Sequence, residues 1–231
     1  MRDVFHEQLD LLVDRLHEMA RMTGDAMEKA TASVSDVDLA LADRVITEGA
    51  HVDTARAEAE ERAYEILALQ APVATDLRVV VAAIHAVRKL ERMGDLAVHV
   101  GEAVRRRHPQ PLVPAPLMPR FAQMGRIAVA MADTTGEVIR TRDTALARIL
   151  EKADDDMDDL YRTLFTVIDY QEWAYGAAKA VDLTLLSRYY ERFADHAVSV
   201  ARQTTFMVTG QPWWTREIPR QGRSPQAASN R

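Results

Sequence analysis

A chain of 231 residues with 48% hydrophobic content can build one compact domain or two small ones around a packed core. The absence of cysteine excludes disulfides and thiolate metal sites, and the net charge of −6 argues against general affinity for nucleic acid. No secretory signal and no apolar run of about 20 residues is visible, so we expect a cytoplasmic protein without direct insertion into a membrane.

Composition and apolar spacing indicate an all-α fold built from long helices. Pro72 is suited to the first turn of a helix, the segment SVSD supplies capping residues before another, and Asp143 can cap a third. Short connections make neighbouring helices antiparallel. We predict helices over residues 3–32, 37–69, 72–107, 117–140, 143–170 and 172–208.

An internal duplication divides these helices into two sets of three. The segment LERMGDLAVHV (90–100) returns as YERFADHAVSV (190–200), at matching places in the third and sixth helices. Between the two sets lies the Pro-rich stretch HPQPLVPAPLMP. We predict a first three-helix bundle over residues 1–108, a linker over 109–119, a second bundle over 120–210 and a disordered tail over 211–231.

The repeated phrase places carboxylates on one face of each helix. Glu91 and Asp95 are four residues apart and therefore lie about one turn apart on the same face, as do Glu191 and Asp195. Two carboxylates this close repel each other unless a cation or a proton intervenes. They therefore either point to water or hold something positive.

The neighbouring helices add further acids at the same height. Folding the chain back near residue 70 places Asp53 opposite about residue 88, within a turn of Glu91. Folding back near residue 173 places Asp154 and Asp158 opposite about residues 192 and 188, beside Glu191. Clusters of hard oxygen donors suit Mg²⁺, Mn²⁺, Ca²⁺ or iron, so the sequence predicts a cation-binding cluster.

Several motifs together resemble the PhoU family of accessory regulators of phosphate uptake. The family's proline turn stands here as PVATDLR (72–78), its acidic phrases as ERMGD (91–95) and ERFADHA (191–197), and its acidic fifth helix as DDDMDDLYRTLF (154–165). The likeness covers about residues 5–209. It implies two three-helix bundles and a non-enzymatic regulator, usually a homodimer.

The resemblance also implies metals and partners. Family members bind multinuclear metal clusters, so Mg, Mn, Fe or Zn ions are expected here. They link the ATPase of the phosphate ABC transporter to a membrane sensor histidine kinase, and they keep the phosphate-starvation response off when phosphate is plentiful.

Carried over by position, the family's ligands form two sites of unequal strength. The second site comprises Asp154, Asp158, Glu191 and Asp195, and the first comprises Asp53, Glu91 and Asp95. Where the family has a further acid in its second helix, this chain has Gly49. Glu48 is one residue away, about 100° around the helix, and replaces that acid poorly. We therefore expect stronger metal binding in the second repeat.

Other interpretations stay open at this stage. The acids could all be solvated on a purely structural bundle, or the bundle could be a carboxylate-bridged metal enzyme or a metal store. The ExxH spelling of EGAH (48–51) is typical of di-iron bundles, but those need a second such pair, which this chain lacks. Asp76 can simply complement a helix dipole, and His99 is either an added ligand or a partly buried polar residue.

Overall fold

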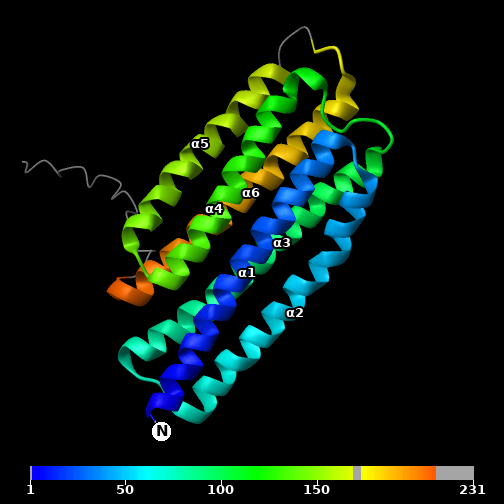
Figure 1. Ribbon diagram of the computed structural model, residues 1–231. Coiled ribbons are helices and arrows are strands. Elements are labelled where there is room, and N and C mark those ends of the chain that lie inside the picture. The colour runs from blue at the N-terminus through cyan, green and yellow to red at the C-terminus, as the bar shows by residue number, and fades with distance from the viewer. Residues whose placement is uncertain (1, 169–172, 212–231) are drawn as a thin grey trace, which may run out of the picture.

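The computed structural model describes residues 2–168 and 173–211, and within these ranges the regular structure is entirely helical. Its elements are α1 (Arg2–Asp36), α2 (Leu39–Gln70), α3 (Ala74–Arg107), the short 3₁₀ helix η1 (Ala115–Leu117), α4 (Met118–Thr141), α5 (Thr144–Ile168) and α6 (Gly176–Thr209), as Figure 1 shows. The predicted all-α fold with two successive sets of three helices is confirmed. None of the described helices is long and apolar enough to cross a membrane.

Two of the predicted helix starts are wrong in the first half. α1 continues through the SVSD segment to Asp36, and the residue that caps α2 is Asp38, whose Oδ1 accepts a hydrogen bond from the Leu41 amide at 3.0 Å. α3 begins at Ala74, so Pro72 lies in the turn before the helix and not in its first turn. This turn lies further along the chain than predicted, which changes the register between α2 and α3.

The second half agrees more closely with the sequence. Asp143 caps α5 as predicted, because its Oδ1 accepts from the Ala145 amide at 2.7 Å. α6 starts later than predicted, at Gly176, whose carbonyl accepts from the Trp173 indole at 2.9 Å. Residues 169–172, where the fifth helix was expected to end and the sixth to begin, and tail residues 212–231 lie outside the described part.

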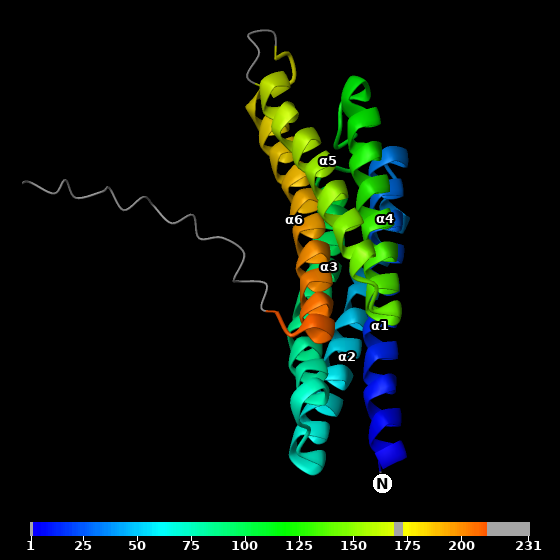
Figure 2. The same ribbon diagram turned by 90° about the vertical axis from the view of Figure 1, so that its left-hand side faces the viewer.

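Four helices form the centre of the molecule and two lie outside it. α1 and α3 pack against α4 and α6, α2 packs only on α1 and α3, and α5 packs only on α4 and α6. Figures 1 and 2 show the resulting elongated bundle, and in Figure 1 α2 and α5 lie at opposite edges. The largest fully buried side chains include Tyr190, Phe121, Phe193, Leu12, Leu16, Met19 and Leu90.

Small residues let α1 and α4 approach closely. A Cβ atom at Gly125 would clash with Thr31, and one at Gly136 would lie 3.1 Å from His17 Nδ1. His17 Nδ1 is also 3.0 Å from the Gly136 carbonyl, and Thr31 Oγ1 is 3.0 Å from the hydroxyl of the buried Tyr190 on α6. The contact between the two halves is therefore a packed, hydrogen-bonded interface.

α3 and α6 run antiparallel along the other side of this interface. Arg107, at the end of α3, forms a 2.5 Å ion pair with the buried Asp182 near the start of α6, and the rings of His99 and Tyr189 lie 5.3 Å apart. Because the halves are packed through two helix pairs, the predicted domain limits at residues 108, 120 and 210 stay a prediction.

Candidate metal centre

The second candidate site lies along the contact between α5 and α6, the two helices that carry its four predicted acids. Asp154 and Asp158 come from α5, and Glu191 and Asp195 come from α6. Loss of solvation, together with the negative charges of Asp195 and Asp158, raises the pKa of Asp154 to about 6. These carboxylates are therefore close enough to repel one another in the absence of a cation.

Glu191 is the most enclosed of these acids. Its side chain is 10% exposed, and its Oε1 accepts from the Arg188 guanidinium, which also lies 5.8 Å from the centre of the Tyr161 ring on α5. Its Oε2 is buried and has no hydrogen-bond partner among the described residues. Burial and the charge of Asp195 raise the pKa of Glu191. A buried carboxylate oxygen without a donor is an incomplete interaction that a cation or a proton would satisfy.

The other two acids of this site lie nearer to solvent. Asp195 is exposed, yet partial desolvation raises its pKa, with Asp158 adding to the rise and Arg188 opposing it. Asp158 pairs with Arg162 on its own helix at 2.6 Å. Glu191 is therefore the most buried acid of this site and Asp195 the most exposed.

The first candidate site, between α2 and α3, is already neutralised by arginine. Arg56 contacts Glu91 at 2.9 Å and Glu60 at 2.6 Å, so it bridges two carboxylates, while Arg92 holds Asp95 at 2.6 Å. Desolvation still raises the pKa of Glu91, although the charge of Arg56 opposes this. A metal ion here would have to displace these ion pairs.

The predicted level of Asp53 is wrong by more than one helical turn. A Cβ atom at Gly94 would lie 3.0 Å from Val52, which places Asp53 beside residue 94. Residue 88, which Asp53 was predicted to face, instead contacts Glu60: the Arg88–Glu60 ion pair is 3.2 Å long. The reason is the later turn between α2 and α3. Asp53 nevertheless lies near the cluster, since its charge raises the pKa of Glu91.

The missing acid at Gly49 has a packing explanation. A Cβ atom there would lie 2.6 Å from Val98 Cγ2, so Val98 occupies the space that a longer side chain would need. Glu48 turns instead toward α1, where it pairs with Lys29 at 2.6 Å. The first site therefore has fewer free carboxylates than the second.

The donor sets decide which site suits a metal ion. In residues 2–168 and 173–211, no three His, Asp or Glu side chains are already gathered as a metal site, so metal binding stays a prediction. The second site fits a hard cation, because it offers an unpartnered buried oxygen and carboxylates of raised pKa. The first site fits one less well, because Arg56 and Arg92 hold two of its three carboxylates. In the second site two of four are held, Glu191 by Arg188 and Asp158 by Arg162.

Asp76 and His99 are the two further residues for which the sequence left alternatives open. Asp76 lies in the first turn of α3, where its charge complements the helix dipole. His99 stacks near Tyr189 of α6, and its Nδ1 is buried without a hydrogen-bond partner in the described part of the chain.

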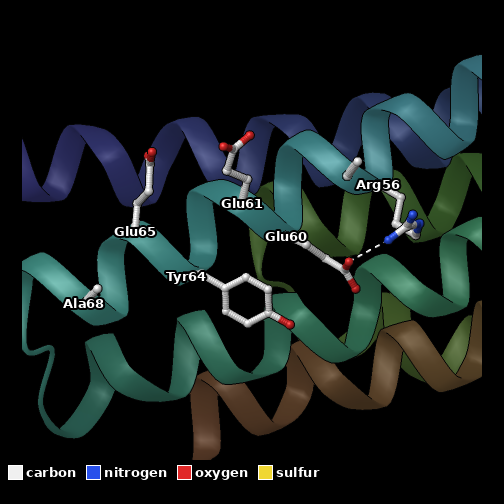
Figure 3. Close-up of a pocket in the computed structure, with 7 residues that line it drawn as sticks. Arg56, Glu60, Glu61, Tyr64, Glu65 and Ala68 are labelled. Atoms are coloured by element: carbon white, nitrogen blue, oxygen red, sulfur yellow. Dashed lines mark hydrogen bonds and ion pairs between the residues drawn. The ribbon is translucent and has the colours of Figure 1, made fainter.

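A shallow depression beside the first site was not foreseen. Its volume is about 580 Å³, and Figure 3 shows Tyr64 and Glu60 on one side of α2 with Glu61 and Glu65 on the other. The dashed contact in Figure 3 joins Arg56 to Glu60. The sequence contained a signal for this pair, since an Arg and a Glu four residues apart on a helix commonly interact.

Two three-helix units, each with an ERxxD phrase on its third helix, define a tandem helical-repeat protein. A family model described as the PhoU domain matches residues 16–104 and again residues 121–204. The chain belongs to the PhoU family.

Named relatives are similar over nearly the whole chain. The chain is 51% identical to the phosphate-specific transport system accessory protein PhoU homolog 2 of Mycobacterium tuberculosis, over 91% of this chain and 99% of that protein. It is 50% identical to PhoU homolog 1 of Mycobacterium leprae, over 91% and 95% of the two chains.

Solved structures share the fold. The crystal structure of the phosphate transport system regulatory protein PhoU from Streptococcus pneumoniae superposes with a TM-score of 0.80 at 20% identity, covering 90% of this chain and 98% of that one. PhoU from Pseudomonas aeruginosa gives a TM-score of 0.78 at 23% identity, over 90% of this chain and all of that one.

Proposed function

We propose that this protein is a non-enzymatic regulator of phosphate uptake that keeps the phosphate-starvation response off when phosphate is plentiful. It acts as an adaptor between the ATPase of a phosphate ABC transporter and a membrane sensor histidine kinase. The observation that carries the proposal is 51% identity to a protein named as a phosphate-specific transport system accessory protein. The protein works in the cytoplasm as a homodimer.

The second carboxylate site gives this regulator a cation-dependent element. A bound divalent or ferric ion, Mg, Mn, Fe or Zn, would be held by Asp154, Asp158, Glu191 and Asp195 and would supply positive charge that cancels their repulsion. These residues belong to two helices, so the same carboxylates that repel without the ion would tie α5 to α6 with it.

Deletion of the gene in its host tests the regulatory function. We expect transcripts for phosphate uptake to rise in phosphate-rich medium and to return to the low level when the intact gene is restored. Unchanged transcripts in a deletion strain that carries no second family member would refute the regulator.

Co-purification tests the adaptor. Tagged protein added to membranes that contain both the transporter and the kinase is expected to recover at least one of them, with and without phosphate compared in parallel. Recovery of neither under both conditions contradicts the contact mechanism.

Elemental analysis after equilibration with Mn²⁺, Mg²⁺ or Fe²⁺ tests the unequal sites. Replacing Glu191 and Asp195 by Ala should remove most bound metal, because it removes two of the four carboxylates of the second site, including the buried oxygen of Glu191 that has no hydrogen-bond partner in the described part of the chain. Replacing Glu91 and Asp95 by Ala is the matched control and should remove little. Equal loss from the two double variants would contradict the asymmetry, and a parent protein without metal would contradict the site itself.

A further inference from the structure

The outer face of α2 carries a depression that no other described helix covers. Among the described helices α2 packs only on α1 and α3, so its opposite side is open. Figure 3 shows Glu61 and Glu65 on one side of the depression and Tyr64 on the other. We call this depression of about 580 Å³ the α2 trough, and its lining residues are Arg56, Ala57, Glu60, Glu61, Tyr64, Glu65 and Ala68.

The α2 trough combines exposed apolar surface with unpaired negative charge. Tyr64 is 49% exposed, and Ala57 and Ala68 are exposed beside it. Glu61 and Glu65 are also exposed, and neither forms an ion pair with any residue in 2–168 or 173–211. An aromatic ring and two methyl groups beside two free carboxylates suit an occupant that carries both apolar and cationic side chains.

The chain carries a segment of this chemistry at its C-terminal end. Residues 212–231, which lie outside the described part of the structure, read PWWTREIPRQGRSPQAASNR, with four arginines and one acidic residue. Arg216, Ile218 and Arg220 alternate along the sequence, so they share one side of an extended chain. Two cations with an apolar residue between them match the free carboxylates and the apolar surface of the trough.

The end of α6 brings this segment to the level of the trough. A Cβ atom at Gly210 would lie 3.5 Å from the guanidinium carbon of Arg78 on α3. The contact of Gly94 with Val52 sets the register of α3 against α2. Ala68 lies as many residues after Val52 as Arg78 lies before Gly94, so the antiparallel helices place Ala68 and Arg78 at one level.

The segment is long enough to cross from α6 to the trough. Packed helices lie about 8–10 Å apart, so two such steps and the half-width of α2 give roughly 25 Å. An extended chain spans about 3.3 Å per residue, which brings Ile218 to the trough from Gly210. On the way, Leu77 of α3 is 40% exposed and offers an apolar surface to Trp213 and Trp214.

We propose that residues 212–223 of this chain bind across α3 into the α2 trough. Ile218 lies against the apolar surface beside Tyr64, and the two flanking arginines pair with the two free glutamates of the trough. The proposal is independent of the regulatory function above. In the isolated protein this segment covers the outer face of α2, so any partner that binds this face has to displace the segment first.

Engineered cysteine pairs test the contact in the full-length chain, which contains no cysteine of its own. Ile218→Cys together with Ala68→Cys should form an intramolecular disulfide about tenfold faster, or more, than Ile218→Cys together with Ala145→Cys. Each rate is divided by the reactivity of the same cysteines toward a small neutral thiol reagent, because neighbouring charges change the pKa of a thiol.

Ala145 is the matched control because it is an exposed alanine nearer to the start of the segment. It lies in the first turn of α5. Arg202 of α6 contacts Glu151 of α5 at 3.4 Å, and Ala145 precedes Glu151 by as many residues as Val208 follows Arg202. A segment without a preferred binding place would therefore meet Ala145 at least as often as Ala68.

Charge reversal tests the ion pairs in the chain with the first cysteine pair. Glu61→Lys with Glu65→Lys should slow disulfide formation by about tenfold, because the arginines of the segment then meet like charge. Added salt should also slow it in the chain without charge reversal. Asp155→Lys with Asp156→Lys makes the same change in net charge at two exposed residues of α5 and should leave the rate unchanged.

Equal rates for the two cysteine pairs, or equal effects of the two charge reversals, would overturn the proposal. So would a disulfide that joins two chains and not one, because the trough would then hold the segment of a second copy. Circular dichroism and melting temperature show whether each variant is folded. Ala57→Cys replaces Ala68→Cys if the latter variant unfolds, since Ala57 is an exposed residue of the same trough.

Discussion

Replacement of Asp154 by Asn should stabilise the metal-free protein at neutral pH. The pKa of Asp154 rises from an ordinary 3.8 to about 6 in the folded state, because the carboxylate is partly desolvated and faces Asp195 and Asp158. A raised pKa means that the folded state binds the proton more tightly than the unfolded state does. Its contribution to stability is therefore fully present below about pH 4 and is lost as the pH rises through about 6.

The magnitude follows from the pKa change. A rise of about 2 units in pKa corresponds to ~3 kcal/mol of stability for a fully buried group. Asp154 is only half-buried, and screening by water reduces this to about 1 kcal/mol, which shifts the melting temperature of a chain of this length by roughly 2–4 °C. In chelator-treated protein near pH 8, Asp154→Asn should melt higher than the parent by this amount, and the difference should vanish below about pH 4.

Saturating metal should reverse the sign of the effect. A cation that binds the folded state stabilises the parent in proportion to its affinity, and Asp154→Asn removes one ligand oxygen charge. Asp156→Asn is the matched control, because Asp156 is exposed on the same helix. The reasoning would be refuted by destabilisation of Asp154→Asn in metal-free buffer near pH 8, or by an equal gain in Asp156→Asn.

Two further changes probe the contact between the halves. Arg107→Gln should lower the free energy of unfolding, measured in urea, by about 1–3 kcal/mol, because it leaves the carboxylate of Asp182 buried without its partner. Adding Asp182→Asn should recover most of this loss. No recovery would show that the ion pair is not the cause. Gly125→Ala should lower the free energy of unfolding by about 1–3 kcal/mol, because the new methyl group would clash with Thr31. Adding Thr31→Ala should restore part of that stability. A Gly125→Ala variant as stable as the parent would contradict the close packing of α1 on α4.

The fold and the helix positions of the second site's acids were predictable because they depend on spacing within helices. Glu191 and Asp195 share a face through the helical period alone, and a short error in register still leaves Asp154 and Asp158 near them. Predicting the helices required only the apolar periodicity, and predicting the duplication required only the repeated phrase at residue 191. These features are local and tolerate errors of a few residues.

The first site was less predictable because it depends on how two helices are aligned. Placing Pro72 inside the helix moved the predicted turn, and the resulting register concealed the contact of Arg56 with Glu91. The exclusion of a side chain at Gly49 depends on Val98, a residue about 50 positions away in sequence. Contacts between distant positions follow from the packed structure and not from any pattern along one helix.

The pairing of α1 with α4 and of α3 with α6 joins helices that hold the same place in each repeat. Each pair runs antiparallel, so the two halves meet as two copies of one subunit meet across a twofold axis. The ion pair of Arg107 with Asp182 breaks this twofold equivalence. The residues at the corresponding positions of the other half are Met207 and Ala82, which cannot form an ion pair. The chain is in this sense arranged like a covalently joined dimer whose two halves differ in their acidic helices: arginines hold Glu91 and Asp95 in the first half, whereas Asp195 in the second has no ion pair within the described residues.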